Sequence, residues 1–335
     1  MKLLSVFAVF ASISLLASTA NAFLNLIPGG GAPSKPADTL QVSNPSAFIG
    51  KSELAVGSFK VTFVTFDKSS STATASMASP DSGFAKMTLR ARLAGVDDAV
   101  FQRLTDFAYQ DFIEQLETNG FKVVDRSRLE SAPSYAKLGV VSSPVKVVST
   151  MTAITGGSRE SATFSPSGLP LYHKREFGAA PRAVPFGIHA VADEAGVPVI
   201  NAHYIVHFAY FQGSATSTSD LKIAKVTLGQ TVRIEHGSQA ELAVGHGGTF
   251  SNPNSNIIMT WGEASDMPYG TTSDATSDAQ VAANTFSSVV GVFSGGSMSA
   301  REYLIQADPA KYSEAAKDVI GRANRLFVGR MGGLR

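Results

Sequence analysis

The most regular pattern of apolar and polar positions lies at residues 200–210. Apolar or aromatic side chains occupy every second position from Ile200 to Tyr210, through the segment NAHYIVHFAY. Such alternation is typical of a β-strand, because successive side chains point to opposite faces. His203 and His207 are then about 13 Å apart, at ~3.3 Å per residue. A zinc ion needs its ligands about 2 Å away, so both histidines are predicted to lie on the more polar face of a strand and not to share a metal ion.

Helical spacing alternates with strand patterns in the first half of the chain. Residues 59–67 alternate β-branched and aromatic side chains and predict a strand that stops at Asp67. The small and polar residues 69–82 predict a loop. Residues 97–119 have apolar positions at helical spacing, an aspartate cap at the start and an Asn-Gly stop, and residues 121–124 predict the next strand.

The second half repeats this alternation. Strands that follow helices at intervals predict an α/β (or α+β) sandwich, in which helices flank a mixed sheet. The elements predicted here, besides the strand at 200–210, are a helix at 188–195, a β-hairpin at 224–244, a strand at 257–263, and helices at 278–293 and 309–330.

Residues 131–185 interrupt the regular order. A strand at 145–155 with a return at 161–164 is predicted, but four prolines from Pro166 to Pro185 argue against continuous structure beyond it. The segment is therefore predicted to be an insertion built as a long loop and β-hairpin.

The first 22 residues have the layout of a secretory signal peptide. A lysine precedes an apolar core of 14 residues, and small residues at Ala20 and Ala22 form a cleavage motif. We expect cleavage after Ala22 and export to the periplasm; an uncleaved membrane anchor is the alternative. Residues 23–57, rich in glycine and proline, are predicted to form a flexible arm, and residues 58–335 a single domain.

Composition narrows the classes of function. The chain has no cysteine, which excludes a thiol nucleophile, cysteine-ligated zinc, an iron–sulfur cluster and a lipidated cysteine. Loss of Lys2 with the signal leaves 27 basic and 27 acidic residues, so bulk charge does not favour nucleic acid. No later segment approaches 18 uninterrupted apolar residues, which predicts no transmembrane helix and leaves other kinds of membrane contact open.

Candidate catalytic patterns are weak. The segment Gly245-His246-Gly247-Gly248 resembles the oxyanion-hole segment of some esterases, but no Gly-x-Ser-x-Gly supplies a nucleophile. No histidine and carboxylate cluster has a metal-ligand spacing. The sequence therefore predicts no enzyme activity, no cofactor and no metal. A hydrolase with an unrecognised site remains an alternative, in which His246 would be the residue to replace.

The order of elements resembles the CsgG-like family of curli secretion components. Residues 60–67, KVTFVTFD, are similar to the family's first strand, which ends in an apolar residue, Phe and Asp. Residues 100–129 resemble its passage of helix, glycine, aromatic residue, strand and Arg-x-x-Leu. Further similar segments are the helix and strand at 190–200, the hairpin at 224–244 and the closing helix at 312–331.

This resemblance implies a periplasmic α/β domain of the anticodon-binding type, ring assembly at the outer membrane and no enzyme activity. In the curli pore each subunit adds two β-hairpins to a shared structure. The present sequence departs from that pattern because it lacks the lipidated cysteine. Its excursions at 131–185 and 246–275 also differ, since residues 145–155 are rich in Ser and Thr where a lipid-facing band is apolar.

Three functions are consistent with these observations. The first is a non-enzymatic, homo-oligomeric subunit of an envelope assembly, secretion or surface-appendage machine, working with other envelope proteins. The second is a solitary periplasmic module that binds a peptide, glycan or envelope component. The third is the hydrolase. The residues predicted to contact partners are Tyr172, His173, Phe177, Trp261 and Tyr269.

Overall fold

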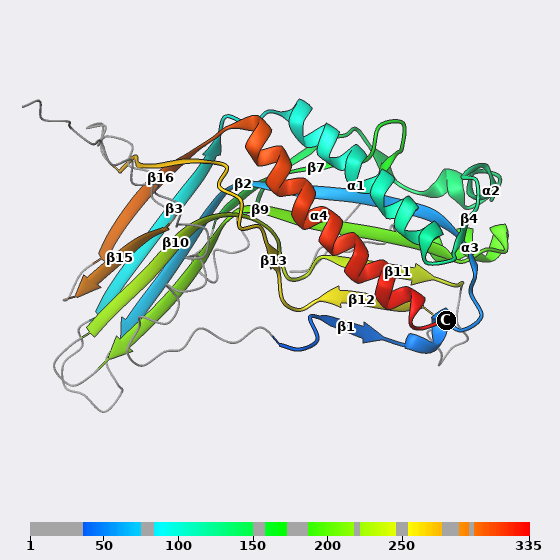
Figure 1. Ribbon diagram of the computed structural model, residues 1–335, viewed down its shortest axis with the longest axis horizontal. Helices are drawn as coiled ribbons and strands as arrows, with labels where there is room; N and C mark the ends of the chain where they lie inside the picture. The colour runs from blue at the N-terminus through cyan, green and yellow to red at the C-terminus, as the bar shows by residue number, and fades with distance from the viewer. Residues whose placement is uncertain are drawn as a thin grey trace, which may run out of the picture. The chain divides into compact units, whose positions relative to one another are not determined.

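The chain folds around one large mixed β-sheet with helices packed on it (Figure 1). The predicted fold class is therefore confirmed. Residues 36–335 form one compact unit. The structure, a computed structural model, describes residues 36–74, 84–149, 158–172, 187–217, 222–245, 254–276, 288–294 and 298–335.

The strands lie in an order that differs from their order in the chain. Across the sheet they follow as β1, β12, β11, β9, β2, β3, β16 and β14. These strands span Leu40–Ser43 (β1), Ser255–Met259 (β12), Gln239–Ala243 (β11), Val199–Ser217 (β9), Glu53–Thr74 (β2), Phe84–Ala94 (β3), Met298–Ala307 (β16) and Gly270–Asp274 (β14).

Shorter strands extend this path at its sides. The strand β10 (Lys222–Ile234) pairs with β9, β13 (Glu263–Ala264) and β15 (Ser288–Ser294). The hairpin of β6 (Val145–Ser149) and β7 (Arg159–Phe164) joins β2 through β7, and β4 (Lys122–Val123) also pairs with β2. A separate two-stranded sheet consists of β5 (Val140–Val141) and β8 (Leu171–Tyr172).

The long strand β2 changes its neighbour half-way along its length. Parallel pairing with β9 covers Ala55 to Phe63, and antiparallel pairing with β3 covers Phe66 to Thr74. Beyond this point β9 stays paired with β10. The sheet therefore divides near residues 64–67, and we call the part before the division the proximal half and the part beyond it the distal half.

In the distal half two sheet layers face each other. The strands β9, β10 and β15 form one layer, and β2, β3 and β16 form the other (Figure 1). The strand β10 packs on β3 without pairing with it. Small and medium side chains are buried between the layers: Ala85, Met87, Leu89 and Ala91 from β3, and Ala224, Val226 and Leu228 from β10.

Two long helices cover one face of the proximal half. The helices α1 (Asp98–Thr118) and α4 (Pro309–Gly332) lie side by side over the strands (Figure 1). Each begins at an aspartate whose side chain accepts backbone N–H bonds: Asp97 accepts from Val100, and Asp308 from Ala310 and Lys311. Such caps satisfy donors that a helix start would leave without partners.

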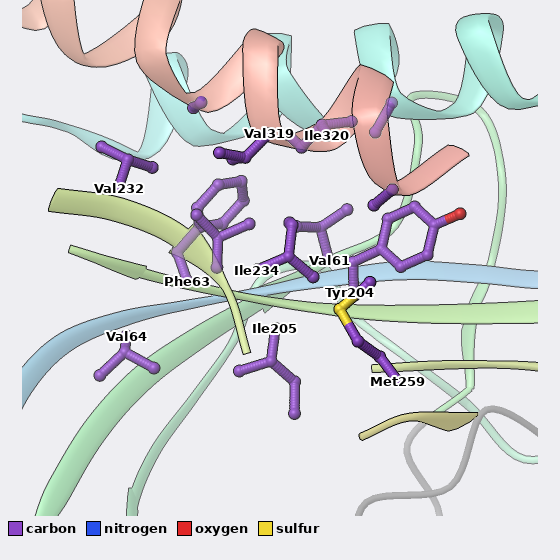
Figure 2. Packing of buried hydrophobic residues seen from close by; sticks show 14 of the residues in the cluster. Val61, Phe63, Val64, Tyr204, Ile205, Val232, Ile234, Met259, Val319 and Ile320 are labelled. Atoms are coloured by element: carbon purple, nitrogen blue, oxygen red, sulfur yellow. The ribbon is translucent and has the colours of Figure 1, made fainter. Parts of the chain in front are cut away.

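Aromatic side chains fill the space between these helices and the sheet. The ring of Phe59 lies 5.5 Å from that of Phe112 in α1, and Tyr204 stacks on Phe327 of α4 at 5.5 Å. Figure 2 shows Val319 and Ile320 of α4 above the strands, with Ile205 on the opposite face of the sheet. Large rings with offset or edge contacts dominate the energetics of such a core.

A second, smaller core lies at the end of the sheet nearest the helix α3 (Ile188–Ala195). It also contains residues from the short helix α2 (Ser127–Glu130). Its buried members include Ala55, Leu129, Leu138, Tyr172, Ile188, Val191 and Val199. The chain also has two single-turn 3-10 helices. One, η2 (Pro45–Phe48), lies before β2, and the other, η3 (Tyr135–Lys137), lies between α2 and α3 in the sequence.

Several predicted elements are confirmed. The helix predicted at 97–119 is α1, with Asp97 as its cap, and the closing helix is α4. The helix at 188–195 is α3, and it ends at Gly196, whose left-handed backbone (φ 61°) suits glycine. The strand at 200–210 is the first part of β9. The strand prediction at 257–263 is confirmed in part, since β12 and β13 are separated by a break.

Other predictions are wrong, and most errors underestimate the strands. The arm predicted at 23–57 already contains β1, η2 and the start of β2, and Phe48 is fully buried. The loop predicted at 69–82 is strand as far as Thr74, and the Ser70 hydroxyl lies 2.9 Å from that of Thr88 in β3. Tertiary pairing overrides the polar local composition here.

Two further predictions are corrected at the sheet edges. Residues 288–294, predicted as the end of a helix, form β15 and pair with β10. In the predicted insertion at 131–185, the hairpin predicted from 145–155 and 161–164 is confirmed as β6 and β7, but it pairs directly with β2, so this part belongs to the main sheet. The signal peptide and the remainder of the predicted helix at 278–287 lie outside the described residues.

Candidate functional site

Two of the five predicted contact residues, Tyr172 and Tyr269, are buried. Tyr172 is 4% exposed, and Tyr269 is fully buried, with its hydroxyl donating to the carbonyl of Phe208. Burial raises the pKa of Tyr269 well above its usual value. His173 and Phe177 lie outside the described residues. Trp261 is half-buried in the link between β12 and β13.

The structure places Tyr172 and Tyr269 in different cores. Tyr172 belongs to the smaller core beside α3, whereas Tyr269 belongs to the main core, where its ring meets Tyr312 edge-on at 5.5 Å. A partner would reach either tyrosine only if the core opened. Both side chains are therefore explained by packing.

Tyr172 does belong to a polar cluster that the sequence did not predict. The guanidinium of Arg126 donates to the hydroxyls of Tyr135 and Tyr172 at 3.0–3.2 Å. It also donates to the carbonyl of Gly57 at 3.0 Å. Burial and the hydrogen bond with Tyr135 raise the pKa of Tyr172. Arg126 thus ties α2 and β8 to the edge of β2.

Gly57, whose carbonyl accepts from Arg126, lies where β2 and β9 approach each other closely. A side chain at Gly57 would lie 2.4 Å from Val199 and 2.7 Å from the Asn201 side chain, so the strands approach closely only with glycine. The register between β2 and β9 shifts at this point, and the side-chain Oδ1 of Asn201 accepts the N–H of Ser58 at 2.9 Å. Side chains replace the backbone pairing that this β-bulge interrupts.

The two histidines of β9 have separate partners, as their spacing along a strand predicts. Nε2 of His203 lies 2.8 Å from the Thr62 hydroxyl, whereas Nε2 of His207 lies 2.9 Å from Asp67 Oδ2. Both side chains are almost completely buried, because both faces of the proximal part of β9 are covered. Among the described residues, no group of three or more His, Asp or Glu side chains is placed to hold a metal ion.

His207 is part of an ionic cluster at the division of the sheet. Asp67 Oδ2 accepts from both His207 and Arg159, the latter at 2.8 Å. Arg159 donates in addition to both carboxylate oxygens of Glu235, at 2.7 and 3.3 Å. This "junction cluster" of Asp67, Arg159, His207 and Glu235 joins β2, β7, β9 and the end of β10 where the two distal layers separate.

The electrostatics of the junction cluster favour ionised carboxylates. Burial would raise the pKa of Asp67, but the hydrogen bond from His207 and the charge of Arg159 hold it below its usual range. Burial opposes ionisation of Glu235 as well, and the Arg159 charge keeps that pKa low too. Both carboxylate side chains are only 12–13% exposed, so their attraction to Arg159 is weakly screened.

The geometry leaves His207 without a nitrogen for proton transfer. Its Nδ1 accepts the backbone N–H of Ala209 at 2.9 Å and its Nε2 lies 2.9 Å from Asp67 Oδ2, so both ring nitrogens have partners within the fold. A general base needs an available nitrogen that faces a substrate proton. The junction cluster is therefore a structural tie between the sheet layers.

Two open grooves flank the helical layer. One, of about 610 Å³, lies beside α1 and β4; its lining includes Tyr109 and Ile113, the carboxylates of Glu114, Glu117 and Asp125, and Arg126. The other, of about 560 Å³, lies between the end of α4 and the segment before β1. Its charged side chains are Asp38, Arg325 and Arg330, and Arg330 bonds Asp38 at 2.6 Å.

Four of the eight large apolar side chains that are exposed in the described part of the chain lie in the distal half. Phe84, Val290, Val292 and Met298 are between 39% and 68% exposed and come from β3, β15 and β16. Val290 and Val292 stand opposite Thr227 and Lys225 of β10, on the outer face of that layer. Phe84 and Met298 alternate with the inward-facing Ala85 and Met87, so they lie on the outer face of the other layer. Exposed apolar groups are typical of interaction surfaces. We call the four residues together the distal apolar surface, which has one part on each outer face.

Comparison with known proteins gives no family for this chain. No family model matches it, and neither the curated proteins nor the solved structures contain a significant match. In the part of the chain that the structure describes, no helix has the length and apolar character needed to span a membrane.

The residues that organise the polar clusters were missed for a physical reason. Arg159 and Glu235 come from separate strands and have no local spacing that marks them. Asp67 and Arg126 did stand out, as the last residue of the predicted first strand and as the arginine of the Arg-x-x-Leu passage. Their partners could not be found without the pairing of distant strands.

Proposed function

We propose that this protein is a non-enzymatic, exported subunit of an outer-membrane-associated machine for assembly, secretion or surface appendages. It acts by self-association into a ring. The observation that carries this proposal is the distal apolar surface, since large exposed apolar side chains on strand ends favour contact with another surface.

The organisation of the fold supports the same proposal. The proximal half is tightly filled and carries the helices, whereas the distal half exposes Phe84, Val292 and Met298 near the ends of its strands. A rigid body with an apolar end can join identical copies through repeated contacts, which close into a ring when the rotation between neighbours allows it. The resemblance to the CsgG-like family and the predicted signal peptide agree with this location and assembly.

The test is the mass of the mature protein, extracted gently from the envelope and measured by mass photometry over a range of concentrations. A uniform particle of many copies, seen as a ring by negative-stain imaging, is the expected result. A species with the mass of one chain at every concentration would contradict self-association. The solitary binding module would then be the better account.

A matched pair of variants tests the observation behind the proposal. V290K/V292K places charges on the distal apolar surface and is expected to reduce the assembled fraction. Val148→Lys, at a valine 65% exposed on β6, is the control and is expected to assemble like the wild type. Equal assembly of both variants would show that the distal apolar surface is not a contact between copies.

A further inference from the structure

The two helices that cover the sheet carry opposite charge. The helix α1 has five acidic residues and one basic residue, a net charge of −4. The helix α4 has five basic residues and two acidic ones, a net charge of +3. Many of these charges have partners within the fold: Asp98 pairs with Lys146, Asp106 accepts from Ser167, Asp111 accepts from Asn324, Arg322 pairs with Asp318 and Glu263, and Arg330 pairs with Asp38. Glu114, Glu117 and Arg325 are exposed.

The helices run in the same direction, which decides where their outer sides lie. The ring of Phe101 meets that of Tyr312 near both helix starts, Asn324 donates to the Ala108 carbonyl in the middle, and Gly332 lies beside Asn119 at the ends. Since the helices contact each other along their whole length, each has one flank turned away from the other.

These outer flanks coincide with the two grooves. The α1 flank carries Tyr109, Ile113 and the exposed carboxylates of Glu114 and Glu117, and we call it the acidic flank. The α4 flank, on the other side of the helical layer, carries the exposed Arg325 with Leu326 and Arg330. We call it the basic flank. Arg126 in the first groove donates to the Gly57 carbonyl, and Asp38 in the second pairs with Arg330. The exposed charges of the two helices at these grooves are then Glu114 and Glu117 on the acidic flank and Arg325 on the basic flank.

We propose that neighbouring copies meet with the acidic flank of one against the basic flank of the next. The inference rests on the proposed function and identifies the surfaces that hold the ring together beside the distal apolar surface. The occupant of each groove is thus a second copy of this chain, chosen by charge complementarity.

The distribution of charge selects a ring over a two-fold dimer. In a two-fold contact the same patch meets itself, which would set Glu114 and Glu117 against their own copies, or Arg325 against Arg325. Like charges placed together are unfavourable. A head-to-tail contact instead pairs opposite charges at every interface and leaves both flanks of each subunit occupied once it closes.

Charge reversal gives a specific test. E114K/E117K makes both flanks basic, and Arg325→Glu makes both acidic. Each variant alone is expected to need at least about a tenfold higher concentration for half-assembly, because every head-to-tail contact then brings like charges together. An equimolar mixture of the two variants is expected to assemble, since alternating copies restore opposite charges at both contacts.

Arg103→Glu is the control, because it changes the charge by the same amount as Arg325→Glu at an exposed position of α1 outside both grooves. It is expected to assemble like the wild type. Wild-type assembly should also weaken between low and high salt, because exposed charge pairs are screened over about 8 Å at physiological ionic strength.

The possible failures can be told apart by mass photometry of the same samples. A monomeric wild type would overturn the proposed function and this inference together. An assembled wild type whose two charge-reversal variants also assemble alone would overturn only the flank contact. Variants that fail alone and fail when mixed, while far-UV circular dichroism shows them folded, would also overturn the head-to-tail pairing.

Discussion

The strand β9 passes through both halves of the molecule, and its two ends have different surroundings. Its first eleven residues, VINAHYIVHFA, are buried on both faces, by the helices on one side and by polar tertiary contacts on the other. Its last five residues, GSATS, are exposed. One continuous strand therefore serves as core in the proximal half and as surface in the distal half.

The difference comes from what covers the sheet. In the proximal half α1 and α4 provide aromatic side chains, so the strands there use large residues such as Phe59, Phe63 and Tyr204. In the distal half the two strand layers cover only each other, and alanines and serines let them approach. Ser71, for example, donates to the Ser214 carbonyl across the layers. The junction cluster lies where one arrangement changes into the other.

The largest expected effect tests the packing of the two halves. Phe112→Ala in the proximal half should lower the free energy of unfolding by about 3–5 kcal/mol, because a fully buried ring leaves a cavity that the surrounding helices and sheet cannot close. Met87→Ala in the distal half should cost about 2 kcal/mol, at the low end for a buried methionine, since the layers can move together. Urea unfolding measures both.

Equal losses for Phe112→Ala and Met87→Ala would mean that the distal layers are as rigidly packed as the helical core. Val292→Ala, at an exposed site, serves as the reference and should change stability by less than about 0.5 kcal/mol.

The next effect tests the tie between the halves. Asp67→Ala should destabilise the protein by about 2–4 kcal/mol, because it removes the shared acceptor of Arg159 and His207 in a largely buried site. Glu160→Ala is the matched control, at the residue that follows Arg159 in β7. It removes an exposed ion pair with Arg92 and should cost at most about 1 kcal/mol. Similar losses would show that the junction cluster is no more important than a surface pair.

A fall in pH should weaken the interactions of the junction cluster. The pKa values of Asp67 and Glu235 are lowered in the folded protein, so their stabilisation is present above the unfolded pKa of about 4. It is lost as the pH falls through the lower folded pKa values. The urea midpoint of the wild type should therefore fall more steeply below pH 4 than that of Asp67→Asn. Parallel curves would refute a contribution of the Asp67 charge.

The smallest effect concerns the start of α1 in the proximal half. Asp97→Ala should cost about 1 kcal/mol, because the Val100 N–H loses its side-chain acceptor. Asp97→Ser retains a capping oxygen and should recover most of this loss. Thermal unfolding followed by circular dichroism distinguishes the two. No difference between them would mean that the cap does not stabilise this helix.

Local patterns were sufficient for the elements whose surroundings are uniform. The helix α1 has apolar residues at helical spacing, a capping aspartate and an Asn-Gly end, and all three act within the segment itself. The proximal part of β9 alternates because its two faces meet different neighbours. These elements, and with them the mixed α/β class, could be predicted without knowledge of the tertiary structure.

The beginning and end of β2 could not be predicted in this way. The bulge at Gly57 breaks the alternation before Phe59, because Asn201 and Arg126 from distant segments satisfy the backbone there. The Ser/Thr-rich end reads as a loop because its polar side chains become strand residues only through pairing with β3. The predicted contact residues Tyr172 and Tyr269 failed similarly, since an aromatic residue in an irregular segment can face either the core or solvent.

The amino-acid sequence by itself thus determined where this chain forms its long helices, the proximal part of β9 and the absence of cysteine chemistry. Those properties depend on spacing and composition within short segments. Only the tertiary structure decided the division of the sheet, the junction cluster and the positions of the two charged flanks. Each of these depends on residues more than a hundred positions apart, such as Asp67 with His207 and Ala108 with Asn324, which strand order and helix packing bring together.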